Sequence, residues 1–189
     1  RFTVDGIATE IPVKLKVHNS VFVPLAKWAM LLAGNYRCVQ PDAMRPIKDA
    51  VHSNLAETRA VYEWVVKLCV SLGADAADMV PFEKYANAAL SLGSPSSAAR
   101  ALAAGAPNIE RVDLLVQSIA AQKGMRLQAV DDTVALVEQW LAKNRAKAVR
   151  AALQSEVIAP ERTVLRKPES TTGDGSNQEA RRVEVRIAD

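Results

Sequence analysis

The hydrophobic period of this chain changes along its length, and that change constrains its fold more than any other feature. Apolar and polar side chains alternate over residues 11–17 and again over residues 183–187, which is the period of a strand with one buried face. Between these ends, apolar residues recur every three or four positions, which is the period of a helix. The sequence therefore predicts an α+β protein in which helices pack on one face of a mixed sheet.

Four segments combine the helical period with residues that start or stop helices. Pro24 stands at a first-turn position, and Gly34 is expected to end the same helix. Asn54 and Glu57 have the spacing of a capping box at the start of the second helix. Gly124 is expected to end the third helix. The predicted helices span residues 24–33, 54–73, 108–124 and 134–153.

Shorter apolar stretches follow the predicted helices. Residues 37–40 and 125–130 are candidates for internal strands, and residues 163–165 are a candidate partner for the terminal strand at 183–187. Residues 167–178, which are rich in Pro, Ser, Thr and Gly, are expected to join that pair as a loop. The predicted element order is βαβαββ.

Composition excludes several classes of partner. The chain is 49% apolar and 24% charged, as in an ordinary globular protein. Its net charge is only +3, and the basic residues are scattered, so nucleic acid is not expected as a partner. No apolar run reaches the roughly 18–20 residues of a membrane-spanning helix. We therefore expect no nucleic-acid binding and no transmembrane segment.

The reactive residues give little material for a metal site or for catalysis. Cys38 and Cys69 match no zinc-binding spacing, and the chain has only two histidines, His18 and His52. Two buried thiols and a single disulfide, which a periplasm permits, both remain open. No glycine-rich dinucleotide motif, P-loop or G-x-S-x-G motif is present. The sequence predicts no metal, no cofactor and no enzymatic activity.

Two stretches of the C-terminal half are similar to motifs of one family. Residues 141–146 read Leu-Ala-Lys-Asn-Arg-Ala, and residues 180–187 read Ala-Arg-Arg-Val-Glu-Val-Arg-Ile. They resemble the L-S-x-x-R-A helix and the closing N-R-R-V-E-I strand of OmpA-like domains, and the resemblance extends over residues 108–187. A fainter likeness at residues 54–60, Asn-Leu-Ala-Glu-Thr-Arg-Ala, suggests a degenerate second copy. The chain would then consist of modules at 1–97 and 98–189.

The resemblance implies a non-catalytic protein of the cell envelope that binds the peptide stem of peptidoglycan or anchors other proteins. In the family, an aspartate takes the ammonium of diaminopimelate and an arginine takes its carboxylate. Asp132 and Arg145 would have these roles in the second module, and Asp42 and Arg59 in the first. The implied location is the periplasm, including association with the outer membrane.

Two alternatives remain open. Ala129 and Val130 stand where the family has Gly and His, which favours a scaffold subunit of an envelope-spanning complex, such as a secretion system or motor, that no longer binds peptidoglycan. Residues 27–35 and 111–121 also resemble the helical domain of ketopantoate-reductase-like dehydrogenases, with Met30 at the position of the lysine that those enzymes need. An all-helical body without a terminal hairpin of strands would distinguish this dehydrogenase alternative from an OmpA-like module.

Overall fold

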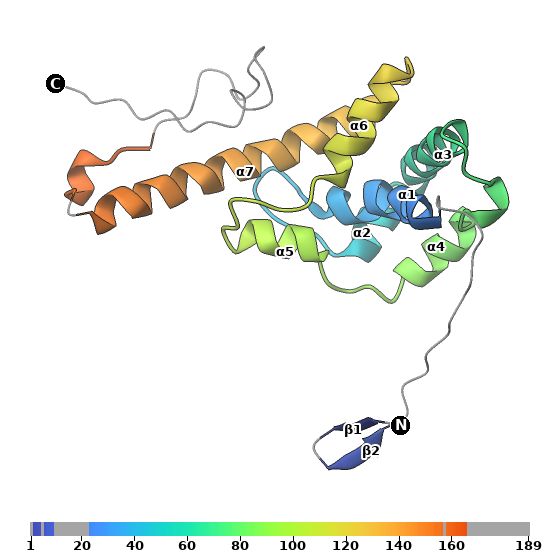
Figure 1. The fold of residues 1–189 in the computed structure, drawn as a ribbon, viewed down its shortest axis with the longest axis horizontal. Coiled ribbons are helices and arrows are strands. Elements are labelled where there is room, and N and C mark those ends of the chain that lie inside the picture. The colour runs from blue at the N-terminus through green and yellow to red at the C-terminus, as the bar shows by residue number, and fades with distance from the viewer. Residues whose placement is uncertain (1, 5, 10–22, 157, 166–189) are drawn as a thin grey trace.

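The computed structural model describes residues 2–4, 6–9, 23–156 and 158–165, and it is mostly helical (Figure 1). Two short strands, β1 (Phe2–Val4) and β2 (Ile7–Thr9), pair antiparallel as a hairpin. The α-helices are α1 (Trp28–Met30), α2 (Ile47–His52), α3 (Leu55–Ser71), α4 (Phe82–Ala89), α5 (Ser97–Ala103), α6 (Val112–Gln122) and α7 (Gln128–Ser155). Shorter helical turns are η1 (Val23–Lys27), η2 (Leu31–Asn35), η3 (Tyr36–Cys38), η4 (Ala76–Asp78) and η5 (Pro160–Arg162).

The predicted α+β fold, with βαβαββ order and helices on one face of a mixed sheet, is wrong. Helices account for 68% of the structure and strands for 3%, and the described residues contain no sheet beyond the β1–β2 hairpin. The alternating segments 11–17 and 183–187 lie outside the described residues. The described part of the chain therefore lacks the sheet on which an OmpA-like module is built.

The other strand candidates within the described residues are also wrong. Residues 128–130 form the first turn of α7, residues 163–165 follow η5 without pairing, and Val39 makes only an isolated bridge to Met44. A short apolar run fits a buried helix end as well as a strand, and its periodicity cannot separate the two.

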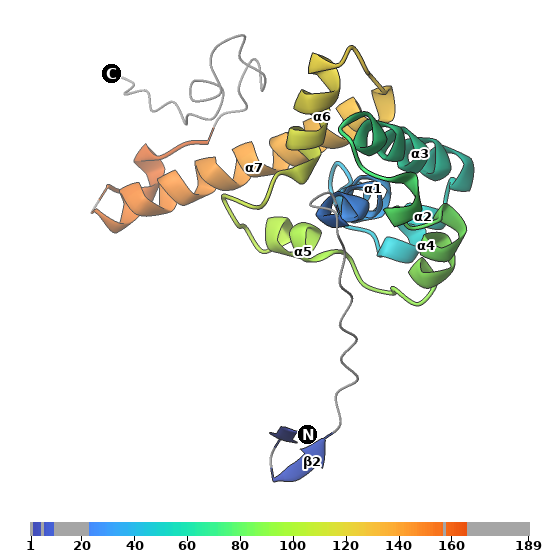
Figure 2. The same ribbon diagram turned by 45° about the vertical axis from the view of Figure 1, so that its right-hand side comes forward.

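One helical run, formed by η1, α1, η2 and η3 and here called the central helix, spans residues 23–38. Its residues contact α2, α3, α5, α6 and α7. In Figures 1 and 2, α1 accordingly lies among the other helices. The predicted helix at 24–33 is confirmed, but Gly34 does not end it. The run continues through a wider π-type turn at η2 to Cys38.

The other predicted helices are confirmed, with shifts at their ends. Asn54 caps α3 by accepting a hydrogen bond from the Glu57 backbone N–H at 3.1 Å. Gly124 has a φ of +69° just after α6, as expected for a residue that ends a helix. Helix α7 begins six residues before the predicted start at 134, and its buried positions follow a helical stripe: Val130, Thr133, Val134, Val137, Leu141 and Asn144.

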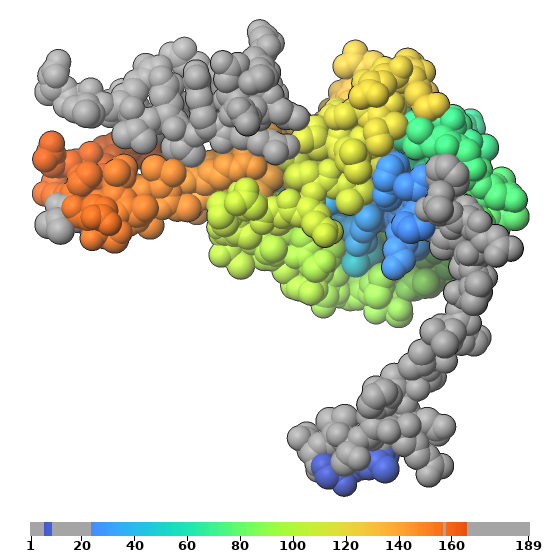
Figure 3. Space-filling model, in the orientation of Figure 1, coloured from blue at the N-terminus to red at the C-terminus, as the bar shows by residue number. Residues whose placement is uncertain are grey.

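The buried core extends across the predicted module boundary at residue 97. One cluster joins Leu32 and Val61 to Val116 and Val130, and a second joins Cys38 to Leu102 and other residues of α5 and α7. None of the α7 residues after Asn144 is buried, and this end of α7 extends beyond the body of the molecule (Figure 3). The division into 1–97 and 98–189 stays a prediction.

Both cysteines are buried and free, so the interpretation as two thiols is confirmed. Burial raises the pKa of Cys69 to about 11 and also raises the pKa of Cys38. Among the described helices, none is both long and apolar enough to cross a membrane.

Candidate functional site

Arg37, at the end of the central helix, is a buried arginine and is only 8% exposed. Its Nη1 donates to Thr58 Oγ1 at 2.8 Å, and its Nη2 pairs with the carboxylate of Glu57. Both partners lie near the start of α3. The charge of Arg37 is thus balanced by a carboxylate and a hydroxyl, which offset the cost of removing it from water.

A second arginine, Arg45, lies beside the first and has no carboxylate of its own. Its Nε donates to the backbone oxygen of Arg37 at 2.9 Å, and its Nη1 donates to Ser53 Oγ at 3.0 Å. No described residue forms an ion pair with it. Burial is the main cause that lowers the pKa of Arg45, and the nearby positive charge of Arg37 lowers it further. An anion placed next to Arg45 would therefore be stabilised.

These two arginines line a pocket of about 140 Å³. The first turns of α7 contribute Asp132 and Thr133, and the remaining lining residues are Val39, Gln40, Glu57, Ala129 and Leu136. Asp132 Oδ1 accepts a hydrogen bond from Gln128 Nε2 at 2.8 Å, and no described residue forms an ion pair with Asp132. One unpaired cation and one unpaired anion therefore line the same pocket.

The structure does not bring together the predicted ligand pair of the second module. Asp132 and Arg145 are thirteen positions apart on α7, which is roughly 20 Å at about 1.5 Å per residue. Arg145 Nη1 pairs with Glu138 at 2.9 Å, and its Nε donates to the backbone oxygen of Pro107 at 3.1 Å. One diaminopimelate end could not reach both residues, because its ammonium and carboxylate share a single carbon. Binding of peptidoglycan by Asp132 or by Arg145 stays a prediction.

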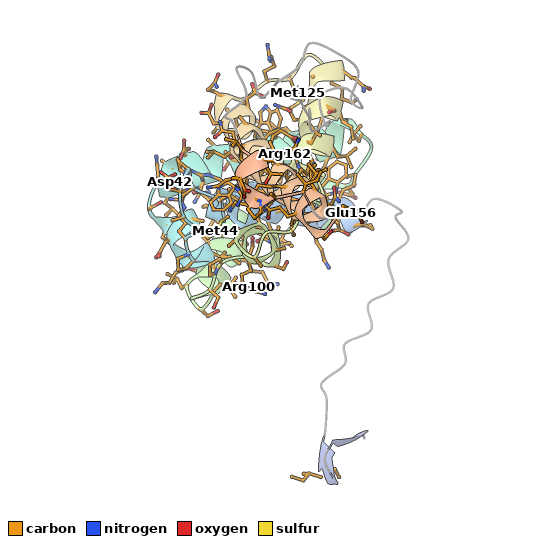
Figure 4. The ribbon with its side chains drawn as sticks, turned by 90° about the vertical axis from the view of Figure 1, so that its left-hand side faces the viewer. Asp42, Met44, Arg100, Met125, Glu156 and Arg162 are labelled. Atoms are coloured by element: carbon orange, nitrogen blue, oxygen red, sulfur yellow. The ribbon has the colours of Figure 1, made fainter. Side chains whose placement is uncertain are left out.

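The predicted pair of the first module is placed on two different surfaces. Asp42 is exposed in the loop before α2, at the outer edge of the molecule (Figure 4). Arg59 lies on α3, where its Nη1 is 2.7 Å from Glu83 and its guanidinium lies over the ring of Phe82. Arg59 therefore joins α3 to α4. The role of this pair in peptidoglycan binding likewise stays a prediction.

A second charged cluster connects α6 to α7. Arg111 contacts Asp113 through two nitrogen–oxygen pairs, at 2.9 and 3.0 Å, and also pairs with Glu138, which in turn pairs with Arg145. Asp113 is fully buried, and Arg111, Glu138 and Arg145 are mostly buried. Burial opposes ionisation of Glu138, but Arg111 and then Arg145 outweigh it and lower the pKa of this carboxyl. Each described charge in this cluster has a partner, so the cluster fixes helices and leaves no free group for a ligand.

The segment that resembles the dehydrogenases lies at the centre of the core. Met30 is half-buried, and its backbone oxygen accepts a hydrogen bond from the Tyr85 hydroxyl at 3.2 Å. A Cβ at Gly34 would lie 1.9 Å from that hydroxyl, so the approach of Tyr85 requires glycine at this position. A thioether at position 30 has no proton to transfer, unlike the ammonium of a lysine.

The second segment with dehydrogenase-like sequence packs against the first, since α6 contacts η2, and Tyr36, the residue after η2, adds two hydrogen bonds. The Tyr36 hydroxyl donates to the backbone oxygen of Glu110 at 2.6 Å and accepts from the Val112 backbone N–H at 3.1 Å. These two bonds fix the start of α6 on the central helix. Burial, partly offset by the bond from Val112, raises the pKa of Tyr36 to about 12, so its hydroxyl keeps its proton at neutral pH.

Sequence reasoning identified Asp132 but missed both arginines of the pocket. One signal for Arg37 was present, because it is the only charged residue between Trp28 and Gln40, and a single charge in an apolar helix requires a buried partner. Arg45 lies in a polar loop and gives no comparable signal.

Comparison with protein-family models, with curated proteins and with solved structures finds no match for this chain.

Proposed function

We propose that this chain is the helical domain of a ketopantoate-reductase-like dehydrogenase that does not itself transfer protons. The observation that carries the proposal is the contact between the two segments with dehydrogenase-like sequence. They are far apart in the chain, yet residues 31–35 of the first contact α6, which begins within the second, and Tyr36, just after the first, accepts a hydrogen bond from the Val112 backbone N–H. Such packing is expected if both likenesses come from one ancestral domain.

The helical body is a second support. The dehydrogenase alternative predicts a helical body without the C-terminal strand hairpin at 163–165 and 183–187, whereas the OmpA-like alternative predicts a mixed sheet. In the described residues, the helices pack around the buried central helix, which contains residues 27–35. A terminal hairpin at 163–165 and 183–187 has no support, because residues 163–165 form no strand and residues 183–187 lie outside the described part.

Met30 limits the proposed activity. The enzymes of this family need a lysine at this position, and a methionine can neither donate a proton nor pair with a carboxylate. The prediction that the chain is not an enzyme is therefore part of the proposal. We expect the domain to contact a 2-oxo acid without reducing it.

The test is to titrate the intact chain and two variants with ketopantoate by calorimetry, and to follow absorbance of a reduced nicotinamide dinucleotide in the same mixtures. Met30→Lys restores an ammonium at a half-buried position, from which a long side chain can extend to solvent. Its ketopantoate affinity should rise about tenfold or more. Met30→Leu is the matched apolar control and should bind as the parent does. No form should consume the nucleotide.

Two results would contradict the proposal. If Met30→Lys and Met30→Leu bind ketopantoate equally, position 30 does not face a substrate. If the intact chain instead co-sediments with purified peptidoglycan sacculi and Arg145→Ala does not, the envelope function and its periplasmic location regain support.

A further inference from the structure

We propose that the pocket beside α7 binds a small zwitterion, an α-amino acid, with its carboxylate on Arg45 and its ammonium on Asp132. This goes beyond the dehydrogenase assignment and does not rest on it, because neither residue belongs to the segments that carry that resemblance.

Arg45 is suited to a carboxylate because its side chain is already oriented. Hydrogen bonds to the Arg37 backbone oxygen and to Ser53 hold Nε and Nη1, and Nη2 has no partner among the described residues. The neighbouring charge of Arg37 adds to the positive potential, although Glu57 offsets part of it. A fixed planar guanidinium loses little side-chain entropy when it binds an oxyanion.

Asp132, on α7, supplies the complementary negative charge. Its Oδ1 accepts from Gln128, and Oδ2 has no partner among the described residues. Asp132 and Arg45 line the same pocket, and no ion pair between them is present in the described residues, so the two opposite charges do not neutralise each other by direct contact. A ligand with an ammonium and a carboxylate would neutralise both charges, whereas a simple anion would neutralise only one.

The size and lining of the pocket limit the ligand further. A volume of about 140 Å³ is enough for a small molecule. Val39, Ala129 and Leu136 provide an apolar part of the lining. An amino acid with a short aliphatic side chain, such as alanine, matches these walls as well as the two charges.

The experiment is a calorimetric titration of the intact chain with L-alanine, and in parallel with propionate and ethylamine, which each keep one of its charges. L-alanine should bind at least about tenfold more tightly than either analogue, because each analogue lacks one charged contact. Asp132→Asn and Arg45→Gln should each weaken L-alanine binding about tenfold or more. Asp42→Asn, which changes an exposed carboxylate outside the pocket, should have no effect.

Arg45→Gln could also weaken the loop it holds, so Arg45→Lys and circular dichroism of every variant are included. Arg45→Lys keeps the charge and loses the planar two-point contact, and it should bind with an affinity between those of the parent and Arg45→Gln. Undetectable L-alanine binding by the folded parent overturns the proposal. Equal binding of propionate and L-alanine also overturns it, because a site for a simple anion would not need Asp132.

Discussion

At the scale of single residues, the Tyr85 hydroxyl occupies the space that a side chain at position 34 would need. The hydroxyl of Tyr85 reaches the backbone of Met30 only because position 34 has no Cβ. We predict that Gly34→Ala lowers the free energy of unfolding by about 1–3 kcal/mol, the usual cost of overpacking a buried site. Chemical denaturation of both proteins, with the unfolding midpoint as readout, measures the change.

A double-mutant cycle assigns that cost to the contact. Tyr85→Phe alone should cost about 1 kcal/mol, because the Met30 oxygen loses its hydrogen bond. In the Tyr85→Phe background, Gly34→Ala should cost clearly less than in the parent, since the clashing oxygen is gone. Additive costs would mean that the two residues do not interact.

The carboxyl group of Glu138 should make stability depend on pH. Its pKa is lowered in the folded state by Arg111 and Arg145, so its contribution is present above the unfolded pKa of about 4.3 and is lost as pH falls through the folded value. We predict that Glu138→Gln lowers stability by about 1–3 kcal/mol at neutral pH. The difference from the parent should shrink in acid. Thermal unfolding at several pH values, with the exposed Glu156→Gln as control, checks this.

The site was only partly predictable from its residues. Asp132 was inferred from the sequence, because the OmpA-like resemblance places a ligand-binding aspartate at this position. Arg45 could not be inferred in this way. It lines the same pocket as Asp132 because the loop before α2 lies beside α7, and no local sequence pattern encodes that packing. Arg145, the partner inferred from the OmpA-like resemblance, lies further along the same helix.

At the scale of elements, the central helix, α3, α6 and α7 were predicted from the sequence, whereas α2, α4 and α5 were missed and the internal strands were predicted wrongly. Asn54 and Gly124 carry local signals that act within one turn, so α3 and α6 were located from the sequence. Residues 125–130 carry no such signal. The sheet that would have paired them is a long-range feature, and the first turn of α7 buries Val130 instead.

The packing of α5 on α7 depends on one buried amide. Asn144 Nδ2 donates to the backbone oxygens of Leu102 at 2.8 Å and Ala106 at 3.0 Å, and the residue is 2% exposed. We predict that Asn144→Leu lowers the free energy of unfolding by about 1–3 kcal/mol, since both oxygens lose this donor. The Leu102 oxygen keeps its bond from the Gly105 backbone N–H. Hydrogen exchange should then increase first in α5. The exposed Lys147→Leu, one turn further along α7, is the control.

At the scale of the whole molecule, the buried core does not follow the boundary at residue 97. The central helix contacts α2 and α3 on the N-terminal side of that boundary and α5, α6 and α7 on the other. Two modules of about a hundred residues would each need a core of its own. Here the central helix of the first half is packed against helices of both halves, so part of its apolar face is buried by the second half.

A shared core predicts that the described body unfolds as one unit. Thermal unfolding should give a single transition in calorimetry, with the calorimetric enthalpy equal to the van't Hoff enthalpy, and circular dichroism and tryptophan fluorescence should report the same midpoint. Trp28 and Trp64 lie before residue 97 and Trp140 after it, so fluorescence of a Trp28→Phe/Trp64→Phe double variant and of Trp140→Phe follows each half separately. Coincident midpoints are expected, because loss of α6 and α7 would expose the central helix. Two separate midpoints would instead support independent modules at 1–97 and 98–189.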